Sequence, residues 1–390
     1  MKPTATGSAG MPRSGIRKLL DLATLIPDAI HLEIGQPDFN TPAHIVDAAY
    51  HAAQAGYTSY TVNAGLASLR ELIALKVARE NDIQATPDCI TVTVGGLGGL
   101  YTAFLALLDP GDEIMLPDPA WPNYLQMACL TRAGVVRYPL DAARGFQPDL
   151  AALPKLVTSR TKAILVNSPA NPTGAVYPRE TLAALVAFAR AHDLYLISDE
   201  CYEKIVFDTE HISPASLVED ASQNSDERII SLFSFSKAYA MTGWRVGFLV
   251  STPELARLFA KIQEATVGCA PSVSQKAAEA ALAGPQDCIP MMVASYQRRR
   301  DRALSILKAH AMPSYVPQGA FYLMVDISPC GMDSDTFAQE LLRDKKVAVA
   351  PGSTFGPSTT GYVRISLATA EDKLAEGLER LCAYIKERSK

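Results

Sequence analysis

The segment 234–248 carries one lysine, Lys237, between small hydroxyl residues and upstream of Arg245. The residues before it are apolar and β-prone, so we expect Lys237 to leave a buried strand and enter a polar loop. A lysine placed in this way can form a Schiff base with a carbonyl compound. Ser234, Ser236 and Arg245 suit a phosphate group, because hydroxyls and a planar guanidinium are good phosphate ligands. Most loop lysines are solvated and inert, so Lys237 alone predicts little.

Two upstream segments end in side chains that could join this lysine. Residues 162–168 form an expected strand followed by a dense run of turn formers that contains Asn171. Residues 194–198 form another, and Asp199 and Tyr202 follow it. In an open α/β sheet the carboxyl ends of the strands border the binding crevice. An amide, an acid, a phenol and an amine should therefore meet at one edge of the sheet.

Strand and helix patterns alternate from about residue 43 to residue 284, which indicates a mainly parallel sheet with helices on both faces. A long helical stretch, 291–310, leads into a second, smaller unit. Within that unit we expect strands at 319–327, 346–350 and 361–367. The fold class is therefore α/β with two units.

The chain closely resembles the class I/II aminotransferases, pyridoxal-phosphate enzymes of fold type I. The resemblance covers nearly the whole length, and the motifs that carry it occur in the family's order: 32–39, Asn171, Asp199, Lys237, Arg245 and Arg364. It implies a large domain, residues 43–290, with a mainly parallel seven-stranded type of sheet. It also implies a small domain made of residues 1–42 and 291–390. Pyridoxal phosphate is the implied cofactor, and Lys237 is the residue that attaches to it.

The resemblance assigns roles around the cofactor ring. Asp199 would pair with the pyridine nitrogen, where a carboxylate favours the protonated ring and so a better electron sink. Tyr202 and Asn171 would donate hydrogen bonds to the phenolic oxygen, and Trp121 would stack on the ring. Asp199 could instead be a helix cap or a surface acid, and Trp121 could be a core residue. Asn171 could also serve as a turn residue, and both of its roles can hold together.

Four further positions would contact the phosphate end of the cofactor. The amides of Gly95, Gly96 and Leu97 lie where a strand passes into a helix, so they could face an anion with the helix dipole behind them. A plain packing turn is the alternative for the glycine pair. Tyr60 matches the family's tyrosine that reaches the phosphate of the neighbouring subunit. This match implies a symmetric homodimer with shared active sites.

Substrate recognition depends on fewer residues. Arg364 matches the family arginine that clamps the α-carboxylate, and Gly35 and Asn171 would assist it. Some similar enzymes that prefer aspartate carry a lysine directly after the glycine pair, whereas this chain has Leu97. A second carboxylate would need a cationic partner there. We therefore expect an apolar or aromatic L-amino acid as donor, with 2-oxoglutarate or pyruvate as the 2-oxo acid acceptor, in a ping-pong mechanism.

Composition excludes several classes of protein. The 36 lysines and arginines against 41 aspartates and glutamates leave a net charge of −5 with no basic block, which argues against nucleic acid as a partner. Seven scattered cysteines indicate free thiols in a reducing cytosol, and no metal site is expected. There is neither a signal-peptide core nor an apolar run of roughly 18 residues. We expect a cytoplasmic protein that does not bind a membrane.

Two alternatives to an aminotransferase stay open. A pyridoxal-phosphate lyase, such as one that eliminates across a carbon–sulfur bond, or a synthase would share Lys237, Asp199 and Arg364. A ligand-sensing regulator on the same fold would need a DNA-binding extension, for which a chain that begins its motifs by Leu32 has little room.

Overall fold

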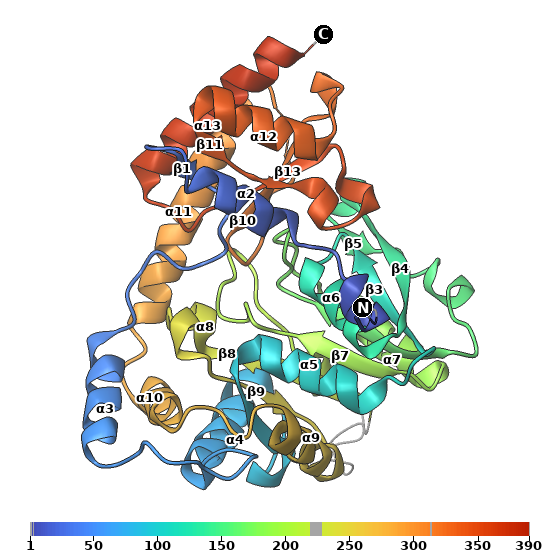
Figure 1. Ribbon diagram of the computed structural model, residues 1–390, viewed down its shortest axis with the longest axis vertical. Helices are drawn as coiled ribbons and strands as arrows, with labels where there is room; N and C mark the ends of the chain where they lie inside the picture. The colour runs from blue at the N-terminus through green and yellow to red at the C-terminus, as the bar shows by residue number, and fades with distance from the viewer. Residues whose placement is uncertain (1, 3, 219–227, 313, 390) are drawn as a thin grey trace.

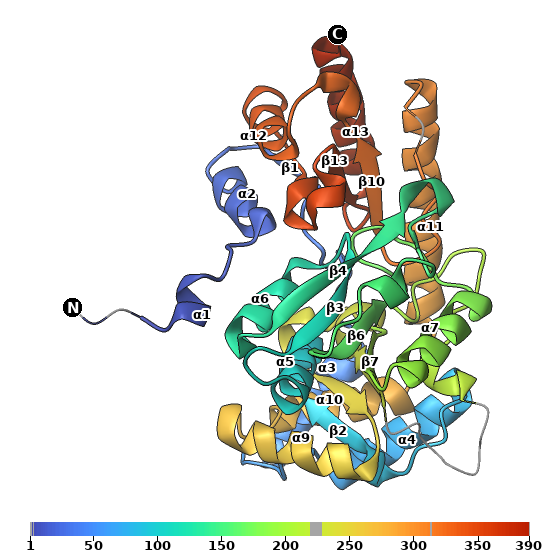
Figure 2. The same ribbon diagram turned by 90° about the vertical axis from the view of Figure 1, so that its right-hand side faces the viewer.

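The computed structural model describes residues 2, 4–218, 228–312 and 314–389. Its largest sheet has eight strands in the order β2-β9-β8-β7-β6-β3-β4-β5 (Figures 1 and 2). These strands are β2 (Ile90–Thr93), β3 (Glu113–Asp118), β4 (Gly134–Asp141), β5 (Gln147–Pro148), β6 (Thr161–Asn167), β7 (Tyr195–Asp199), β8 (Ile229–Ser234) and β9 (Gly247–Val250). The five strands from β8 to β4 run parallel, while β2, β9 and β5 join by antiparallel pairing.

The central strands form a parallel sheet because they are apolar along nearly their whole length. In β6, β7 and β8 almost every residue is buried, which is the pattern of strands covered on both faces by helices. The expected mainly parallel sheet is confirmed: five of the eight strands run parallel, and the sheet has one strand more than the seven expected. The additional strand is β5, two residues that pair with the end of β4.

Helices cover both faces of this sheet (Figure 2). They are α3 (Ala43–Gln54), α4 (Ala67–Asn81), α5 (Gly95–Leu107), α6 (Pro122–Thr131), α7 (Arg179–Ala191), α8 (Phe235–Ala238), α9 (Pro253–Thr266) and α10 (Ser272–Ala283). From the sequence we expect a helix that starts at Leu97, but α5 begins two residues earlier, at Gly95. Glycine disfavours helix by about 1 kcal/mol per residue, yet the glycines here let α5 approach β8: a Cβ at Gly99 would lie 2.6 Å from Leu232 Cδ1.

The C-terminal part contains two smaller sheets and three long helices, at the top of Figure 1. Antiparallel strands in the order β10-β13-β12 form one sheet, and β1 pairs in parallel with β11 in the other. Their bounds are β1 (Ile30–His31), β10 (Tyr322–Asp326), β11 (Val347–Ala348), β12 (Ala350–Pro351) and β13 (Tyr362–Ser366). The helices are α11 (Cys288–Ala309), α12 (Ser334–Lys345) and α13 (Glu371–Arg388).

The N-terminal segment connects the two parts of the molecule. The pairing of β1 with β11 sets Ile30 opposite Val347 and so places this segment on the C-terminal part. Before it, α2 (Gly15–Ala23) packs against α12, and α1 (Thr6–Ala9) packs against α6 beside the large sheet. The exact division into a domain of residues 43–290 and a domain of residues 1–42 with 291–390 stays a prediction.

Two local expectations were wrong. Lys237 does not lie in an open loop, because Phe235–Ala238 form the short helix α8, in which the Ser234 hydroxyl accepts a hydrogen bond from the Ser236 amide at 3.1 Å. The expected strand at 346–350 divides into β11 and β12, which join different sheets. Across the described residues, no helix is both long enough and apolar enough to cross a membrane.

Candidate active site

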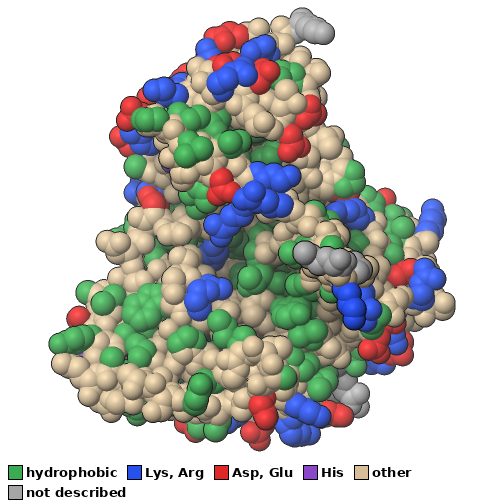
Figure 3. Space-filling view, in the orientation of Figure 1, with side chains coloured by type: hydrophobic (Ala, Val, Ile, Leu, Met, Phe, Trp, Pro, Cys, Tyr) green, Lys and Arg blue, Asp and Glu red, His purple; other side chains and the backbone are tan. Residues whose placement is uncertain are grey.

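A cavity of about 1070 Å³ lies between the two parts of the molecule, bordered by the N-terminal segment. Figure 3 shows the surface hollowed in this region, with lysine and arginine side chains beside the hollow. Twelve of the residues expected at the site line the cavity: Gly35, Gly96, Leu97, Trp121, Asn171, Asp199, Tyr202, Ser234, Ser236, Lys237, Arg245 and Arg364. Segments from the whole length of the chain therefore meet here, and among them are Asn171, Asp199, Tyr202 and Lys237, which the strand-end argument placed together.

Lys237 extends from α8 into the cavity, and its Nζ donates a hydrogen bond to the Gly35 carbonyl oxygen at 2.6 Å. Burial lowers the pKa of Lys237 to about 8, and the charges of Arg364 and Arg245 act in the same direction. A larger fraction of the amine is then neutral near pH 7 than in an ordinary lysine. The neutral amine is the form that attacks a carbonyl group.

Asp199 ends β7 and is buried below the cavity. Its Oδ2 accepts a hydrogen bond from the Tyr124 hydroxyl at 2.6 Å, and its Oδ1 accepts one from the Cys201 amide at 3.1 Å. Burial raises the pKa of Asp199, and these two hydrogen bonds oppose the rise. Sequence reasoning missed Tyr124, although it lies three residues after Trp121 and packs against it edge to face with ring centroids 5.5 Å apart.

Arg364 is 1% exposed and stands at the other side of the cavity. Its Nη1 donates to Asn171 Oδ1 at 2.8 Å, and its Nη2 donates to the Glu33 carbonyl oxygen at 2.6 Å. The guanidinium also lies over the Tyr322 ring, 4.1 Å from its centroid. Burial lowers the pKa of Arg364 because a charge is costly away from water. A bound anion would offset that cost, so the buried guanidinium favours an anionic partner. The amide NH2 of Asn171 remains as the group that can donate into the cavity.

Tyr322 was not identified from the sequence. Its hydroxyl lies 2.7 Å from the Tyr202 hydroxyl, and burial raises the pKa of Tyr202 well above its ordinary value. A Cβ at Gly35 would collide with the Tyr322 hydroxyl, which explains why that position carries glycine. The apolar strand around Tyr322 contains no local signal that separates it from an ordinary core tyrosine.

The amino end of α5 forms the anion-binding part of the cavity. Gly95 has φ +66°, and a Cβ there would collide with the Arg245 guanidinium, while a Cβ at Gly96 would lie 2.9 Å from Cys201 Sγ. Gly96 and Leu97 at the start of α5 line the same cavity as Arg245, Ser234 and Ser236, so helix amides, a guanidinium and two hydroxyls are available there. These donors fit the phosphate of pyridoxal phosphate, and Lys237 and Asp199 fit its aldehyde and its ring nitrogen.

Two of the expected residues do not line the cavity. Gly95 lies just behind it, in contact with Arg245, and so keeps a place in the anion-binding end. Tyr60 is 94% exposed on the surface, so within one chain it cannot contact a ligand in this cavity.

In the described part of the chain, no cluster of histidine, cysteine, aspartate or glutamate could hold a metal ion. All seven cysteines lie in that part, and all are free thiols.

The outer part of the cavity contains residues that sequence reasoning missed. Arg13 and Arg17, around the start of α2, line the cavity together with Leu97, which is 40% exposed. Arg13 forms an ion pair with Asp21, whereas Arg17 forms none with any described residue. No motif marks these arginines, since only the packing of α2 against the C-terminal part brings them to the cavity.

Comparisons with known proteins agree with this site. Residues 27–381 match the family described as aminotransferase class I and II. The chain is 39% identical over 388 residues to the aspartate/prephenate aminotransferase of Thermus thermophilus, covering 99% of this chain and 97% of that protein. It is 37% identical over 379 residues to aromatic-amino-acid aminotransferase 2 of Thermococcus litoralis, covering 96% of each.

A solved structure is also similar throughout. The aspartate aminotransferase of Thermus thermophilus with maleate matches with a TM-score of 0.93 at 37% identity, covering 98% of this chain and 100% of that one. These similarities support transamination and give no support to a lyase. This chain therefore belongs to the class I and II aminotransferases, which depend on pyridoxal phosphate, and it is an aminotransferase.

Proposed function

We propose that the enzyme moves the amino group of an apolar or aromatic L-amino acid to a 2-oxo acid by a ping-pong mechanism. The observation that carries this proposal is that Lys237, Asp199 and Arg364 face one cavity whose outer wall includes Leu97. The first two groups serve every amino acid alike. The third binds the carboxylate that amino and 2-oxo acids share, so both substrates can use the site in turn.

The residues around the cofactor have distinct tasks in this proposal. When bound, pyridoxal phosphate supplies an electron sink for the α-carbon of the substrate. Lys237 would hold the cofactor and, as a free amine, would move the proton at Cα as a general base and acid. Asp199 would hold the ring nitrogen in its protonated state, and Asn171 and Tyr202 would donate to the phenolic oxygen. To do its work Lys237 must leave the Gly35 carbonyl, which it contacts at 2.6 Å.

Different groups would hold the cofactor and the substrate. Ser234, Ser236, Arg245 and the α5 amides keep the cofactor phosphate in place, while Arg364 orients the α-carboxylate with help from Gly35 and Asn171. The side chain would enter the outer cavity beside Leu97 and Trp121. An apolar side chain can lose its water there without leaving a charge unpaired.

Arg17 favours a second candidate for the outer cavity. Its guanidinium lines the cavity without an ion pair to a described residue, so it could receive the distal carboxylate of a dicarboxylic substrate such as 2-oxoglutarate or aspartate. The Thermus thermophilus relative is named for aspartate and prephenate, and the Thermococcus litoralis relative for aromatic amino acids. We propose that Arg17 serves the acceptor, while Leu97 sets the preference for the donor.

We propose further that two copies of the chain form a homodimer in which Tyr60 reaches the phosphate site of the other copy. The support is an exposed group of hydrophobic residues on the same stretch of chain: Tyr50, Tyr57, Tyr60 and Val62. Figure 3 shows hydrophobic side chains spread over the lower part of the face that it draws. A contiguous exposed apolar surface is typical of an interface between proteins.

A half-reaction assay tests the proposed function. Purified holoenzyme is mixed with single amino acids, and conversion of the cofactor to its amino form is followed by absorbance. We expect conversion with phenylalanine and leucine at a higher kcat/KM than with aspartate, followed by return to the starting form with 2-oxoglutarate. Release of ammonia without conversion would contradict transamination, and a strong preference for aspartate would contradict the donor assignment.

A further inference from the structure

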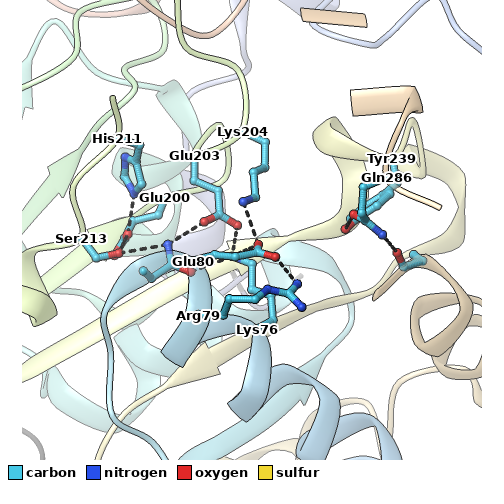
Figure 4. A network of polar contacts seen from close by, with 12 residues as sticks. Lys76, Arg79, Glu80, Glu200, Glu203, Lys204, His211, Ser213, Tyr239 and Gln286 are labelled. Atoms are coloured by element: carbon cyan, nitrogen blue, oxygen red, sulfur yellow. Dashed lines mark hydrogen bonds and ion pairs between the residues drawn. The ribbon is translucent and has the colours of Figure 1, made fainter. Parts of the chain in front are cut away.

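Figure 4 shows a network of polar contacts that includes Glu200 and Glu203, which are neighbours of Asp199 and Tyr202 in the chain. Asp199 and Tyr202 line the cavity, whereas Glu200 and Glu203, which alternate with them along the chain, do not. Glu200 contacts His211 and Ser213, and Glu203 contacts Lys76 on α4. Asp199 and Tyr202 thus face the cavity, while the carboxylates of Glu200 and Glu203 fix the same turn through contacts away from it.

The charge of Glu203 is compensated. Its carboxylate forms an ion pair with Lys76 and accepts a hydrogen bond from Asn81 Nδ2 at 2.7 Å. Burial opposes ionisation of Glu203, but Lys76 and Lys204 outweigh it and lower the pKa of Glu203. This carboxylate is therefore a stable half of a buried ion pair, which mainly anchors the turn to α4.

The charge of Glu200 is not compensated to the same degree. The side chain is 0% exposed, and its Oε2 accepts hydrogen bonds from His211 Nε2 at 2.8 Å and from the Ser213 hydroxyl. Its Oε1 and the His211 Nδ1 have no hydrogen-bond partner among the described residues. In the described ranges no lysine or arginine forms an ion pair with Glu200: Lys76 pairs with Glu203 instead, and His211 is the ionisable side chain that contacts the Glu200 carboxylate.

Glu200 is also fixed through its backbone. Its amide donates to the Leu232 carbonyl oxygen of β8 at 2.9 Å, and its own carbonyl accepts from the Glu203 amide at 3.0 Å. Leu232 lies two residues before Ser234, in the strand that leads to Lys237. A displacement of Glu200 would therefore disturb Asp199, Tyr202 and the end of β8 together.

We propose that Glu200 is a positioning residue for transamination: its buried carboxylate locks the Asp199–Tyr202 turn and places a second negative charge behind Asp199. This inference rests on the proposed roles of Lys237 and Asp199. The charge of Glu200 raises the pKa of Asp199, in the same direction as burial. A negative charge here also stabilises positive charge on the ring nitrogen and on the nitrogen of Lys237, because the interior screens charges weakly.

Glu200→Gln separates charge from shape, since glutamine keeps an oxygen that can accept from His211 and Ser213. The measurement is the pH titration of the visible absorbance of holoenzyme, whose midpoint reports protonation at Lys237. Loss of the negative charge should lower this midpoint by about half a pH unit and lower kcat several-fold. The matched control is Glu80→Gln, which removes a carboxylate at the far side of the network, where it contacts Lys204 at 2.7 Å, and should leave the midpoint unchanged.

Glu200→Asp tests the position of the carboxylate at constant charge. We expect a titration midpoint close to that of the unmodified enzyme, because the charge is kept. We expect a kcat lower by about tenfold, because the side chain is one methylene shorter and can no longer hold the turn through His211 and Ser213. Unmodified kcat in Glu200→Asp would overturn the positioning role even if Glu200→Gln does not fold. An unchanged midpoint in folded Glu200→Gln would overturn the electrostatic role.

The same titration distinguishes failure of this inference from failure of the proposed function. If the unmodified protein shows no absorbance from a cofactor attached to Lys237, the proposed function itself is wrong. If it shows that absorbance and the Glu200 variants titrate and turn over as the unmodified enzyme does, only the role of Glu200 is wrong.

Discussion

The inner and outer ends of the cavity are built in opposite ways. At the inner end, Asp199 and Arg364 are buried and each has at least two hydrogen-bonded partners. At the outer end, Leu97 is 40% exposed and Arg17 has no ion-pair partner among the described residues. Groups that act on every substrate are thus fixed by buried contacts, while groups that meet the variable side chain stay exposed. Changes at the inner end should therefore reduce catalysis, and changes at the outer end should redirect it.

Lys237→Ala should produce the largest effect at the inner end. The variant should bind pyridoxal phosphate without a covalent bond and lose turnover by a factor on the order of 10⁴, because no other residue is placed to move the α-proton. Lys237→Arg is the control that keeps a positive charge but cannot attach. Turnover and borohydride trapping measure the result, and near-normal kcat in Lys237→Ala would refute the assignment.

Arg364→Ala should mainly weaken substrate binding. Loss of a buried charged partner for the α-carboxylate should raise KM for amino and 2-oxo acids by about a hundredfold. Arg364→Lys keeps the charge but cannot bind in the two-pronged manner, so its KM should lie between the two. Steady-state kinetics with both substrate types check this, and an unchanged KM for both would show that another cation binds the α-carboxylate.

At the outer end, Leu97→Lys should shift kcat/KM towards dicarboxylic substrates by about tenfold, the size of one modest interaction. Arg17→Ala should lower the ratio of kcat/KM for 2-oxoglutarate to kcat/KM for pyruvate, because the cation that would bind the distal carboxylate is lost. Lys18→Ala is the matched control, because Lys18 is exposed on the same helix and does not line the cavity. Equal ratios in all three variants would mean that neither residue contacts the substrate side chain.

Tyr124→Phe should have the smallest effect. The Tyr124 hydrogen bond lowers the pKa of Asp199, so its loss raises that pKa further. Asp199 then takes up a proton at a higher pH, and the acidic limb of the kcat profile should move to higher pH, with kcat falling about threefold because the Cys201 amide still donates. Tyr195→Phe at the opposite end of β7 from Asp199 is the control, and a profile that moves to lower pH would contradict the assigned hydrogen bond.

The sequence predicted most of the inner end because its residues follow strands with clear apolar runs. Asp199 directly ends β7, and Lys237 follows β8 by three residues, so local pattern and strand order were enough to bring them together. The sequence predicted the ends of helices less well. The glycines at the start of α5 indicated a turn, yet they lie inside the helix, where they allow it to pack close to β8. Tyr124 and Tyr322 were missed because their partners, Asp199 and Tyr202, lie 75 and 120 residues away in the chain.

By itself, the sequence determined the fold class, since buried strands leave a periodic signal, and the ordered motifs that resemble the class I/II aminotransferases implied the cofactor. Tertiary structure alone decided which side chains hold those residues and which ones face the substrate. Arg17 lines the same cavity as Leu97 only because α2 packs on the C-terminal part, and Glu200 acquires its partners only because the chain returns to it at His211 and Ser213. Contacts between distant segments depend on how whole elements pack, and no local pattern encodes that packing.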